Sequence, residues 1–179
     1  MRYAVLKLAG TYRESPPSGS PLNAPPARSF RFDLFYRQIK RLTRTRRITR
    51  VLVIADNSFN AGSYGALQGI RALLEELTSS GMETWYFAAD YSDAQLYLAG
   101  ACVHRIIHPI GSVRCVGLYR NSLFFKRLMD QYGMEVQIAR RGKYKSAYDR
   151  FRLDAIDPDN REQYAQWLQT AALTLHSGI

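Results

Sequence analysis

The stretch RVLVIADNSFNAGSYG, residues 50–65, decides the fold class. Its first half, RVLVIADN (50–57), is a continuous run of branched apolar residues, the pattern of a strand buried on both faces in a parallel sheet. Its second half interrupts the strand with Asn and Gly, and a helix then runs to a C-terminal cap at Gly81. The apolar positions of that helix are Leu67, Ile70, Leu74 and Leu77. Strand, glycine-containing turn and helix form one βα unit.

The same alternation continues on both sides of this unit. Further strands are predicted at residues 3–10, 82–89, 103–108 and 134–140. Helices are predicted at 91–101 and at 121–133, the latter ended by Gly133. Alternating strands and helices predict an α/β domain with a mostly parallel sheet covered by helices. At 179 residues, we expect one domain.

The segments before and after these units are marked by their caps and prolines. Residues 14–28 are rich in proline, which predicts a loop or arm without regular structure. Ser29 is then expected to cap a helix, and Asp157 with Pro158 to open the last one. The apolar residues of the first helix are Phe32, Phe35, Tyr36, Ile39 and Leu42, and those of the last are Tyr164, Trp167, Leu168, Ala171 and Leu175.

The net charge of +10 is large for this length, and much of it falls between residues 28 and 50. The cations there are Arg28, Arg31, Arg37, Lys40, Arg41, Arg44, Arg46, Arg47 and Arg50. They fit a solvated helix face, an acidic partner, or contact with the phosphates of a membrane. Nucleic acid is the less favoured partner, because no nucleic-acid-binding motif accompanies the charge. The sequence has no membrane-spanning run and no secretory signal, so we expect a soluble chain.

Histidine and cysteine suggest neither a metal nor a cofactor. His104 and His108 alternate along a predicted strand and would lie about 13 Å apart, too far to share an ion. Cys102 and Cys115 show neither zinc-ligand spacing nor a disulfide pattern.

Two small motifs invite a catalytic interpretation. The NAGSYG turn contains Gly62 and has backbone N–H groups before a helix, where an oxyanion could be held, although a tight turn that merely needs glycine also explains it. Ser92 lacks the G-x-S-x-G context of a nucleophile. With Gln95 three residues later, Ser92 instead forms a capping box, so we expect its hydroxyl to cap the following helix.

The segment RRGKYKSAYDRF, residues 140–151, raises a sharper question. Its lysines, Lys143 and Lys145, fit an exposed basic loop, an anion site or a catalytic base. A lysine acts as a base only when its pKa falls from about 10.4 toward neutrality, which burial and neighbouring cations promote. Nearby arginines and aromatic residues make this feasible, but simple exposure explains the pattern as well.

A family resemblance favours the catalytic interpretation. GKYKSAYDRF, followed by the DP-x-x-RE helix start, resembles the lysine-bearing segment of the signal peptide peptidase A family of serine peptidases. The resemblance extends over residues 3–175 and includes FNAGSYGALQGIRALLEEL and YSDAQLYLAGACVHRIIHPIGSV. It implies a ClpP/crotonase-type fold of stacked ββα units.

The resemblance also implies an activity, which is cleavage of remnant signal peptides at the membrane by a Ser-Lys dyad. Lys145 matches the general base, and Gly62 and Ser146 are expected near the oxyanion or the substrate. The implied partners are a serine-bearing second domain, apolar signal-peptide-like substrates and further copies of the chain. No cofactor is implied. The location implied for the full-length protein is the membrane, on its periplasmic or extracytoplasmic side.

The chain departs from the family at the nucleophile. Where a serine-bearing domain has S-G-G-Y-Y, this sequence has SDAQLY, so that Asp93 occupies the serine's place. We therefore expect the N-terminal, lysine-bearing half of a two-domain peptidase, inactive by itself and lacking the family's N-terminal anchor. The alternatives are a non-catalytic peptide-binding or assembly module of the same fold, and a surface that binds nucleic acid or anionic lipid through residues 28–50.

Overall fold

The computed structural model describes residues 2–15, 29–45, 47–137 and 148–179. The chain divides into two compact units: unit 1 is Met1–Val116 with Leu175–Ile179, and unit 2 is Gly117–Thr174. The expectation of one domain over the whole chain stays a prediction. Most of the proline-rich stretch 14–28 lies outside the described residues.

Unit 1 is built on a parallel sheet, as predicted. Its strands are β1 (Tyr3–Leu8), β4 (Arg50–Ala55), β5 (Glu83–Ala88) and β7 (His104–Ile107), and they lie side by side in that order. All neighbours are parallel and in a continuous register that aligns Val5, Leu52, Trp85 and His104 across the sheet. The stretch that begins at residue 50 therefore forms an inner strand of the sheet.

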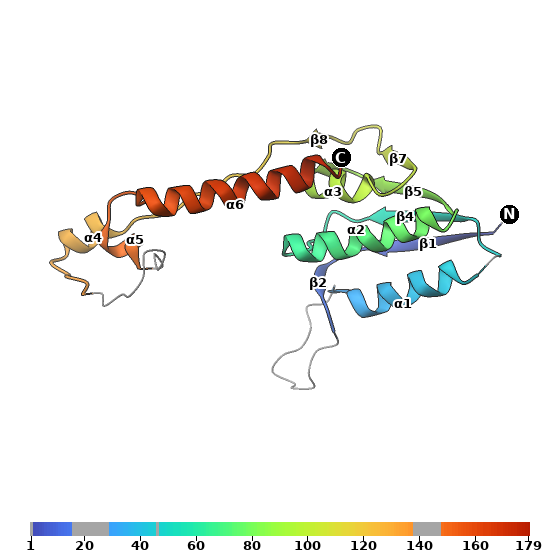
Figure 1. Ribbon diagram of the computed structural model, residues 1–179, viewed down its shortest axis with the longest axis horizontal. Helices are drawn as coiled ribbons and strands as arrows, with labels where there is room; N and C mark the ends of the chain where they lie inside the picture. Colours follow the sequence, from blue (N-terminus) through green and yellow to red (C-terminus); the bar gives the residue numbers. More distant parts are fainter. Residues whose placement is uncertain (1, 16–28, 46, 138–147) are drawn as a thin grey trace. The chain divides into compact units, whose positions relative to one another are not determined.

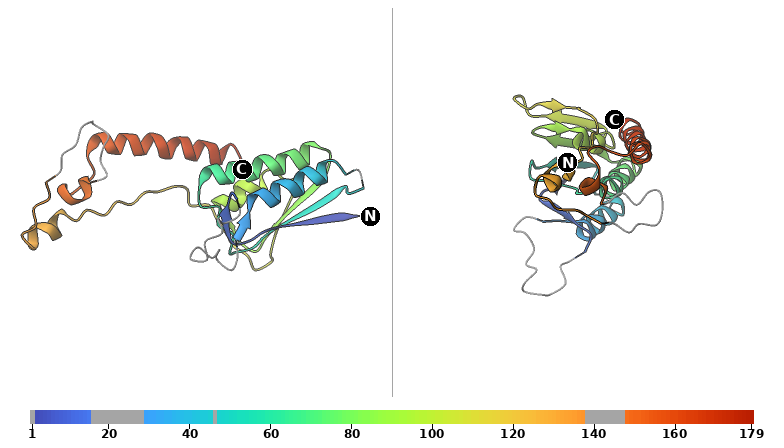
Figure 2. Two further views of the ribbon diagram at one scale, coloured as in Figure 1. Left: turned by 90° about the horizontal axis from the view of Figure 1, so that it is seen from below. Right: turned by 90° about the vertical axis from the view of Figure 1, so that its left-hand side faces the viewer.

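Three helices connect successive strands and lie on the same side of the sheet (Figures 1 and 2). They are α1 (Phe32–Thr43), α2 (Tyr64–Ser79) and α3 (Asp93–Ala99). Spatial and sequence order of the strands agree, so right-handed crossovers all place their helix on one face. The core between helices and sheet contains Leu8, Ile39, Val51, Val53, Ile70, Leu74, Leu77, Tyr86 and Leu98, all fully buried.

The opposite face of the sheet is less covered, which corrects the prediction that residues 50–57 are buried on both sides. Val51 and Val53 point to the helices and are fully buried, whereas Leu52 and Ile54 on the other face are half-buried. Next to them, Trp85 stacks on His104 with ring centres 3.9 Å apart, and Val5 is 44% exposed. The hydrophobic run reflects one buried face and one apolar face that is partly open.

Four short strands form two further pairs outside the main sheet. β2 (Thr11–Arg13) pairs with β3 (Ser29–Arg31), and β6 (Tyr91–Ser92) pairs with β8 (Val113–Arg114). The predicted cap at Ser29 is wrong, because Ser29–Arg31 is held extended by β2 and α1 begins only at Phe32. Arg31 at the helix start offers no side-chain cap, and it forms an ion pair with Asp33 at 2.7 Å.

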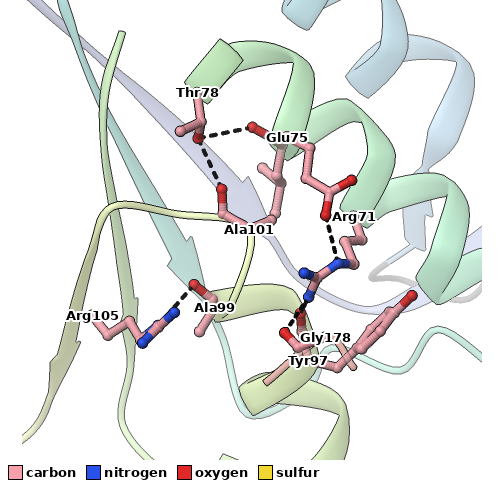
Figure 3. Close-up of polar contacts among 9 residues, drawn as sticks. Arg71, Glu75, Thr78, Tyr97, Ala99, Ala101, Arg105 and Gly178 are labelled. Carbon is pink, nitrogen blue, oxygen red and sulfur yellow. Dashed lines mark hydrogen bonds and ion pairs between the residues drawn. The ribbon is translucent and has the colours of Figure 1, made fainter. Parts of the chain in front are cut away.

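The C-terminal cap of α2 follows the prediction. Gly81 has φ +85°, a left-handed conformation that glycine adopts without strain, and its N–H donates to the Thr78 carbonyl at 3.1 Å. The Thr78 hydroxyl donates to the Ala101 carbonyl at 2.8 Å and shares a hydrogen bond with Thr84. These contacts fix the end of α2 against β5 and the turn after α3 (Figure 3).

Arg71 joins three segments of unit 1 (Figure 3). From α2 it pairs with Glu75 at 2.8 Å, and its guanidinium donates to the carbonyls of Tyr97 in α3 and Gly178 near the last residue described. The guanidinium also lies 4.6 Å from the centre of the Tyr97 ring. Residues 175–179 are thereby held against α2 and α3.

Unit 2 contains shorter elements than predicted, apart from its last helix. α4 covers Lys126–Gln131 instead of 121–133, and Gly133 follows it with φ +64°. Residues 134–137 of the strand predicted at 134–140 are not in a strand, since no described strand lies beside them to share hydrogen bonds, and 138–140 lie outside the described residues.

The last helices of unit 2 are α5 (Asp149–Arg152) and α6 (Pro158–His176), whose end belongs to unit 1. The predicted start of α6 is confirmed, because Asp157 accepts hydrogen bonds from Asp159 and Arg161 N–H groups. Over the residues described, no helix combines the length and the apolar character needed to cross a membrane.

Candidate functional site

The carboxyl ends of the parallel strands gather the turns of unit 1 at one edge, where open α/β sheets bind their ligands. The turns after β1 and β4 are tied together there. The Gly10 N–H donates to Ser58 Oγ at 3.1 Å, and the Asn60 N–H donates to the Gly10 carbonyl at 3.0 Å. These hydrogen bonds join the two turns at this edge of the sheet.

Gly62 lies in the second of these turns, with φ +72°. Its N–H donates to Asn60 Oδ1 at 2.8 Å, which closes a local turn, and Ser63 caps α2 by accepting from the Ala66 N–H at 3.2 Å. The candidate oxyanion donor is thus already hydrogen-bonded inside the chain. Any oxyanion role for Gly62 would require that bond to be released.

Asp90 connects the turns after β5 and β7. It accepts from the N–H of Ser112 at 2.9 Å and from its hydroxyl at 2.8 Å. Asn57 reaches the same carboxylate from the turn after β4, at 3.4 Å. The hydrogen bonds from Ser112 lower the pKa of Asp90, so the group is held as a carboxylate.

Ser92 is the N-cap of α3, as predicted. Its hydroxyl accepts from the Gln95 N–H at 3.4 Å. The Gln95 side chain does not complete the capping box in return, because it accepts a hydrogen bond from the buried Tyr86 hydroxyl. The Ser92 hydroxyl is therefore engaged as a helix cap.

Asp93, the residue predicted to occupy the nucleophile's place, is the first residue of α3. Its Oδ1 accepts from the thiol of Cys115 at 3.2 Å, and this hydrogen bond raises the thiol's pKa. The sequence reasoning missed the contact, since the two residues are far apart in the chain and only the pairing of β6 with β8 brings them together.

Cys102 is buried, and His104 contacts a carboxylate. Both cysteines are free, and burial raises the pKa of Cys102 to about 11. His104 Nε2 lies 3.2 Å from Glu83 Oε1. Within the described ranges, no group of three His, Cys, Asp or Glu side chains is arranged to hold a metal ion.

Lys143, Lys145 and Ser146 lie outside the described residues, but the segment directly after them is well anchored. Asp149, at the start of α5, is 5% exposed and pairs with Arg152 at 3.1 Å. The Asn160 amide donates to the other oxygen of Asp149 at 3.4 Å, which ties α5 to α6.

A cavity of about 470 Å³ lies beside this anchor in unit 2. Its apolar lining includes Leu123, Phe125 and Ile156, and Asp149 and Asn160 are among its polar residues. The Phe125 N–H donates to the Arg150 carbonyl at 2.6 Å, and the Phe125 ring stacks on Phe151. The residues that follow the lysine segment therefore pack against both α6 and the stretch before α4.

Comparison with known proteins gives a match to Peptidase family S49 over residues 76–172. The chain is 30% identical over 123 residues to Protease 4 of Salmonella typhi, an alignment covering 69% of this chain and 20% of that protein. It is also 30% identical over 117 residues to Protease 4 of Haemophilus influenzae, covering 65% and 19% respectively. The chain thus spans about a fifth of the length of these curated relatives.

Proposed function

Because the chain belongs to peptidase family S49, the signal peptide peptidase A family, we propose that it is the base-donating part of a serine peptidase. The family match covers more than half of the chain and includes the positions of both Asp93 and Lys145. The parallel sheet with helices laid along it agrees with the ClpP-like fold of the family.

The proposed base is Lys145. In its neutral form, Nζ takes the proton from a serine hydroxyl while the serine Oγ bonds to the carbonyl carbon of the scissile peptide. The resulting ammonium then protonates the leaving amine as the C–N bond breaks, and water releases the acyl group from the serine. The neighbouring cations Arg140, Arg141 and Lys143 favour the neutral form, since like charges lower the pKa of a lysine.

The nucleophile in this proposal comes from another domain or subunit, and the observation that carries this is the start of α3. Asp93 stands where the motif of a serine-bearing domain has serine, and its carboxylate is engaged with Cys115. Ser92, one residue earlier, uses its hydroxyl to cap the helix. A carboxylate at this place supports a division of labour in which this chain supplies the lysine alone.

The proposed substrates are remnant signal peptides or other apolar peptides, bound extended, with Gly62 and Ser146 near the reacting carbonyl. The full-length protein is proposed to work at the membrane, on its extracytoplasmic side. Partner contacts, including contacts with further copies of the chain, are supported by the large apolar side chains that unit 2 exposes. Examples are Tyr119 at 79% and Leu123 at 75% exposure.

A peptidase assay tests the dyad. A fluorogenic apolar peptide is offered to this chain alone, to a serine-bearing family domain alone and to their mixture, with complex formation checked by size-exclusion chromatography. We expect activity in the mixture only, abolished by Lys145→Ala and retained in the neighbouring control Lys143→Ala. Activity in the mixture should also rise with pH through the pKa of the lysine. Unchanged activity in Lys145→Ala would refute the dyad.

The second candidate function is a non-catalytic module of the same fold that holds peptides or builds an assembly. It is favoured by the engaged Asp93 and by the exposed apolar surface of unit 2. A complex that forms but stays inactive with every apolar peptide tested would support this function over the catalytic one.

A further inference from the structure

Helix α1 presents a face of arginines on the side away from the core. Phe35, Ile39 and Leu42 are the buried residues of the helix and mark its inner side. Arg37, Arg41 and Arg44 recur at intervals of four and three, so they lie together on the opposite side, and all three are exposed. We call these three residues the basic face of α1.

Among the described residues, the basic face has few carboxylates to balance its charge, with Asp33 near enough to Arg37 for a coulombic effect. The nearby carboxylates are already used, since Glu76 holds Lys40 at 2.7 and 2.8 Å and Asp33 holds Arg31 at 2.7 Å. None of the three arginines of the basic face forms an ion pair with any residue that the structure describes. Such an arrangement leaves three guanidinium groups available to an external anion.

The surface around the basic face is a shallow hollow, which suits a flat and extended partner. The three arginines, together with Tyr36, Lys40 and Thr45, line a shallow hollow of about 620 Å³ on the outside of the helix. Tyr36 is 45% exposed beside the cations, with the Lys40 ammonium 5.3 Å from its ring centre, and Leu34 nearby is 43% exposed. Cations flanked by a tyrosine and a leucine fit the boundary between lipid headgroups and acyl chains.

We propose that the basic face of α1 binds the anionic surface of a phospholipid bilayer, with its arginines on the headgroup phosphates. A bilayer fits better than nucleic acid, because no nucleic-acid-binding motif accompanies these arginines and Tyr36 is the one aromatic side chain among the described residues that line the hollow, whereas single-stranded nucleic acid is bound by several stacking aromatic side chains. Guanidinium groups bind phosphate through paired N–H donors, and each basic residue near an anionic membrane strengthens binding about fivefold. The contact does not depend on Lys145 or on any peptidase activity.

Vesicle co-sedimentation of the whole chain tests the proposal. Phosphatidylcholine vesicles with and without phosphatidylglycerol are compared for the parent chain and for Arg37→Gln/Arg41→Gln/Arg44→Gln. The matched control, Arg114→Gln/Arg127→Gln/Arg161→Gln, removes the same charge from exposed arginines elsewhere. Circular dichroism confirms that each variant is folded, and Arg37→Lys/Arg41→Lys/Arg44→Lys keeps the charge.

We expect binding only to the vesicles that contain phosphatidylglycerol, weakened about a hundredfold in the first variant and only a few-fold in the control. The lysine variant should retain most of the binding, and high salt should abolish it because exposed charges are screened. Equal losses in the two glutamine variants would overturn the proposal. So would displacement by millimolar inorganic phosphate at constant ionic strength, which indicates a discrete phosphate site, or tighter binding of duplex DNA with the same dependence on the three arginines.

Discussion

Unit 1 and unit 2 differ in what they bury. All of the fully buried large apolar side chains that the structure describes belong to unit 1, among them Ile70, Leu74 and Tyr86. In the described part of unit 2 the buried residues are polar, namely Asp149 and Asn160. Unit 1 therefore has a hydrophobic core of its own, whereas unit 2 is held by a small polar cluster and by partly exposed apolar contacts.

This difference between the units affects the surroundings expected for the proposed base, Lys145. Lys145 belongs by sequence to unit 2, whose apolar side chains are largely in solvent: Tyr119, Leu123, Leu128, Tyr132, Met134, Tyr148, Trp167 and Leu173 are exposed. Where exposed apolar side chains are contiguous, they mark surfaces that associate with other proteins. A base that becomes active only when a serine-bearing partner binds is consistent with such a surface, because burial by the partner would also lower the lysine pKa.

The largest effect that separates the two units is expected from matched leucine truncations. Leu74→Ala in α2 removes a fully buried side chain from the core of unit 1 and should lower the free energy of unfolding by about 2–5 kcal/mol. Leu173→Ala in α6, where the side chain is 64% exposed, should change it by less than about 0.5 kcal/mol. Urea unfolding followed by circular dichroism measures both. Equal losses would mean that unit 2 has a core that the exposures do not reveal.

A smaller loss is expected when the guanidinium of Arg71 is removed from unit 1. Arg71→Met keeps the aliphatic stem but leaves the carbonyls of Tyr97 and Gly178 without this donor, at a cost of about 2–3 kcal/mol. Arg71→Lys, with a single ammonium group, should fall between Met and Arg. Hydrogen exchange should show faster exchange for residues 175–179 in the Met variant. No change there would show that other contacts hold this segment.

In unit 2 the corresponding test is a substitution in the polar cluster of Asp149, Arg152 and Asn160. Asp149→Ala removes the carboxylate that Arg152 and Asn160 share, and leaves the buried Asn160 amide without it, which should cost about 1–2 kcal/mol. The control Asp154→Ala removes a half-exposed carboxylate that lies 3.4 Å from Arg127, and should cost almost nothing. Protection of the α5 amides from hydrogen exchange reports the effect. If both variants behave alike, the cluster does not anchor α5.

The elements of unit 1 are predicted better from the sequence than those of unit 2, because unit 1 has the hydrophobic core. Helix α2 has a strong hydrophobic period and strands β1, β4 and β5 are short apolar runs, because these elements pack against each other, and Gly81 and Ser92 act locally. The helix cap predicted at Ser29 is wrong, because pairing with β2 holds Ser29 in a strand. In unit 2, the periodic pattern at 121–133 predicts a longer helix, but only the short α4 forms. None of the residues of α4 is buried, so a longer helix would gain little stability from packing.

The candidate site was predictable only where it depends on neighbours in the sequence. The Ser92 cap follows from a three-residue spacing, and it is present. The contacts of Asp93 with Cys115 and of Asp90 with Ser112 join turns more than twenty residues apart, which no local pattern encodes. Lys145, Ser146 and the oxyanion role of Gly62 remain predictions that the assay with a serine-bearing partner will decide.

The smallest expected difference between the units is their response to acid. The carboxylates with a lowered pKa in the described part of the chain, Asp33, Glu83 and Asp90, all lie in unit 1. For Glu83 the cause is first the hydrogen bond from Arg50, at 2.6 Å. The pKa of Glu83 is lower in the folded than in the unfolded state. Glu83 therefore stabilises unit 1 at pH values above its ordinary pKa of 4.5, and this contribution is lost as the pH falls through the lowered pKa.

The urea midpoint of unit 1 should therefore decrease slightly below pH 4.5, and less so in Glu83→Gln, which has no proton to gain. The effect is small because the pair is partly exposed and screened by solvent. Probes in unit 2, such as the exchange of the α5 amides, should show no dependence on Glu83. If Glu83→Gln and the parent chain lose stability equally as the pH falls, the ion pair with Arg50 makes no net contribution, and the acid response of unit 1 lies in Asp33 and Asp90.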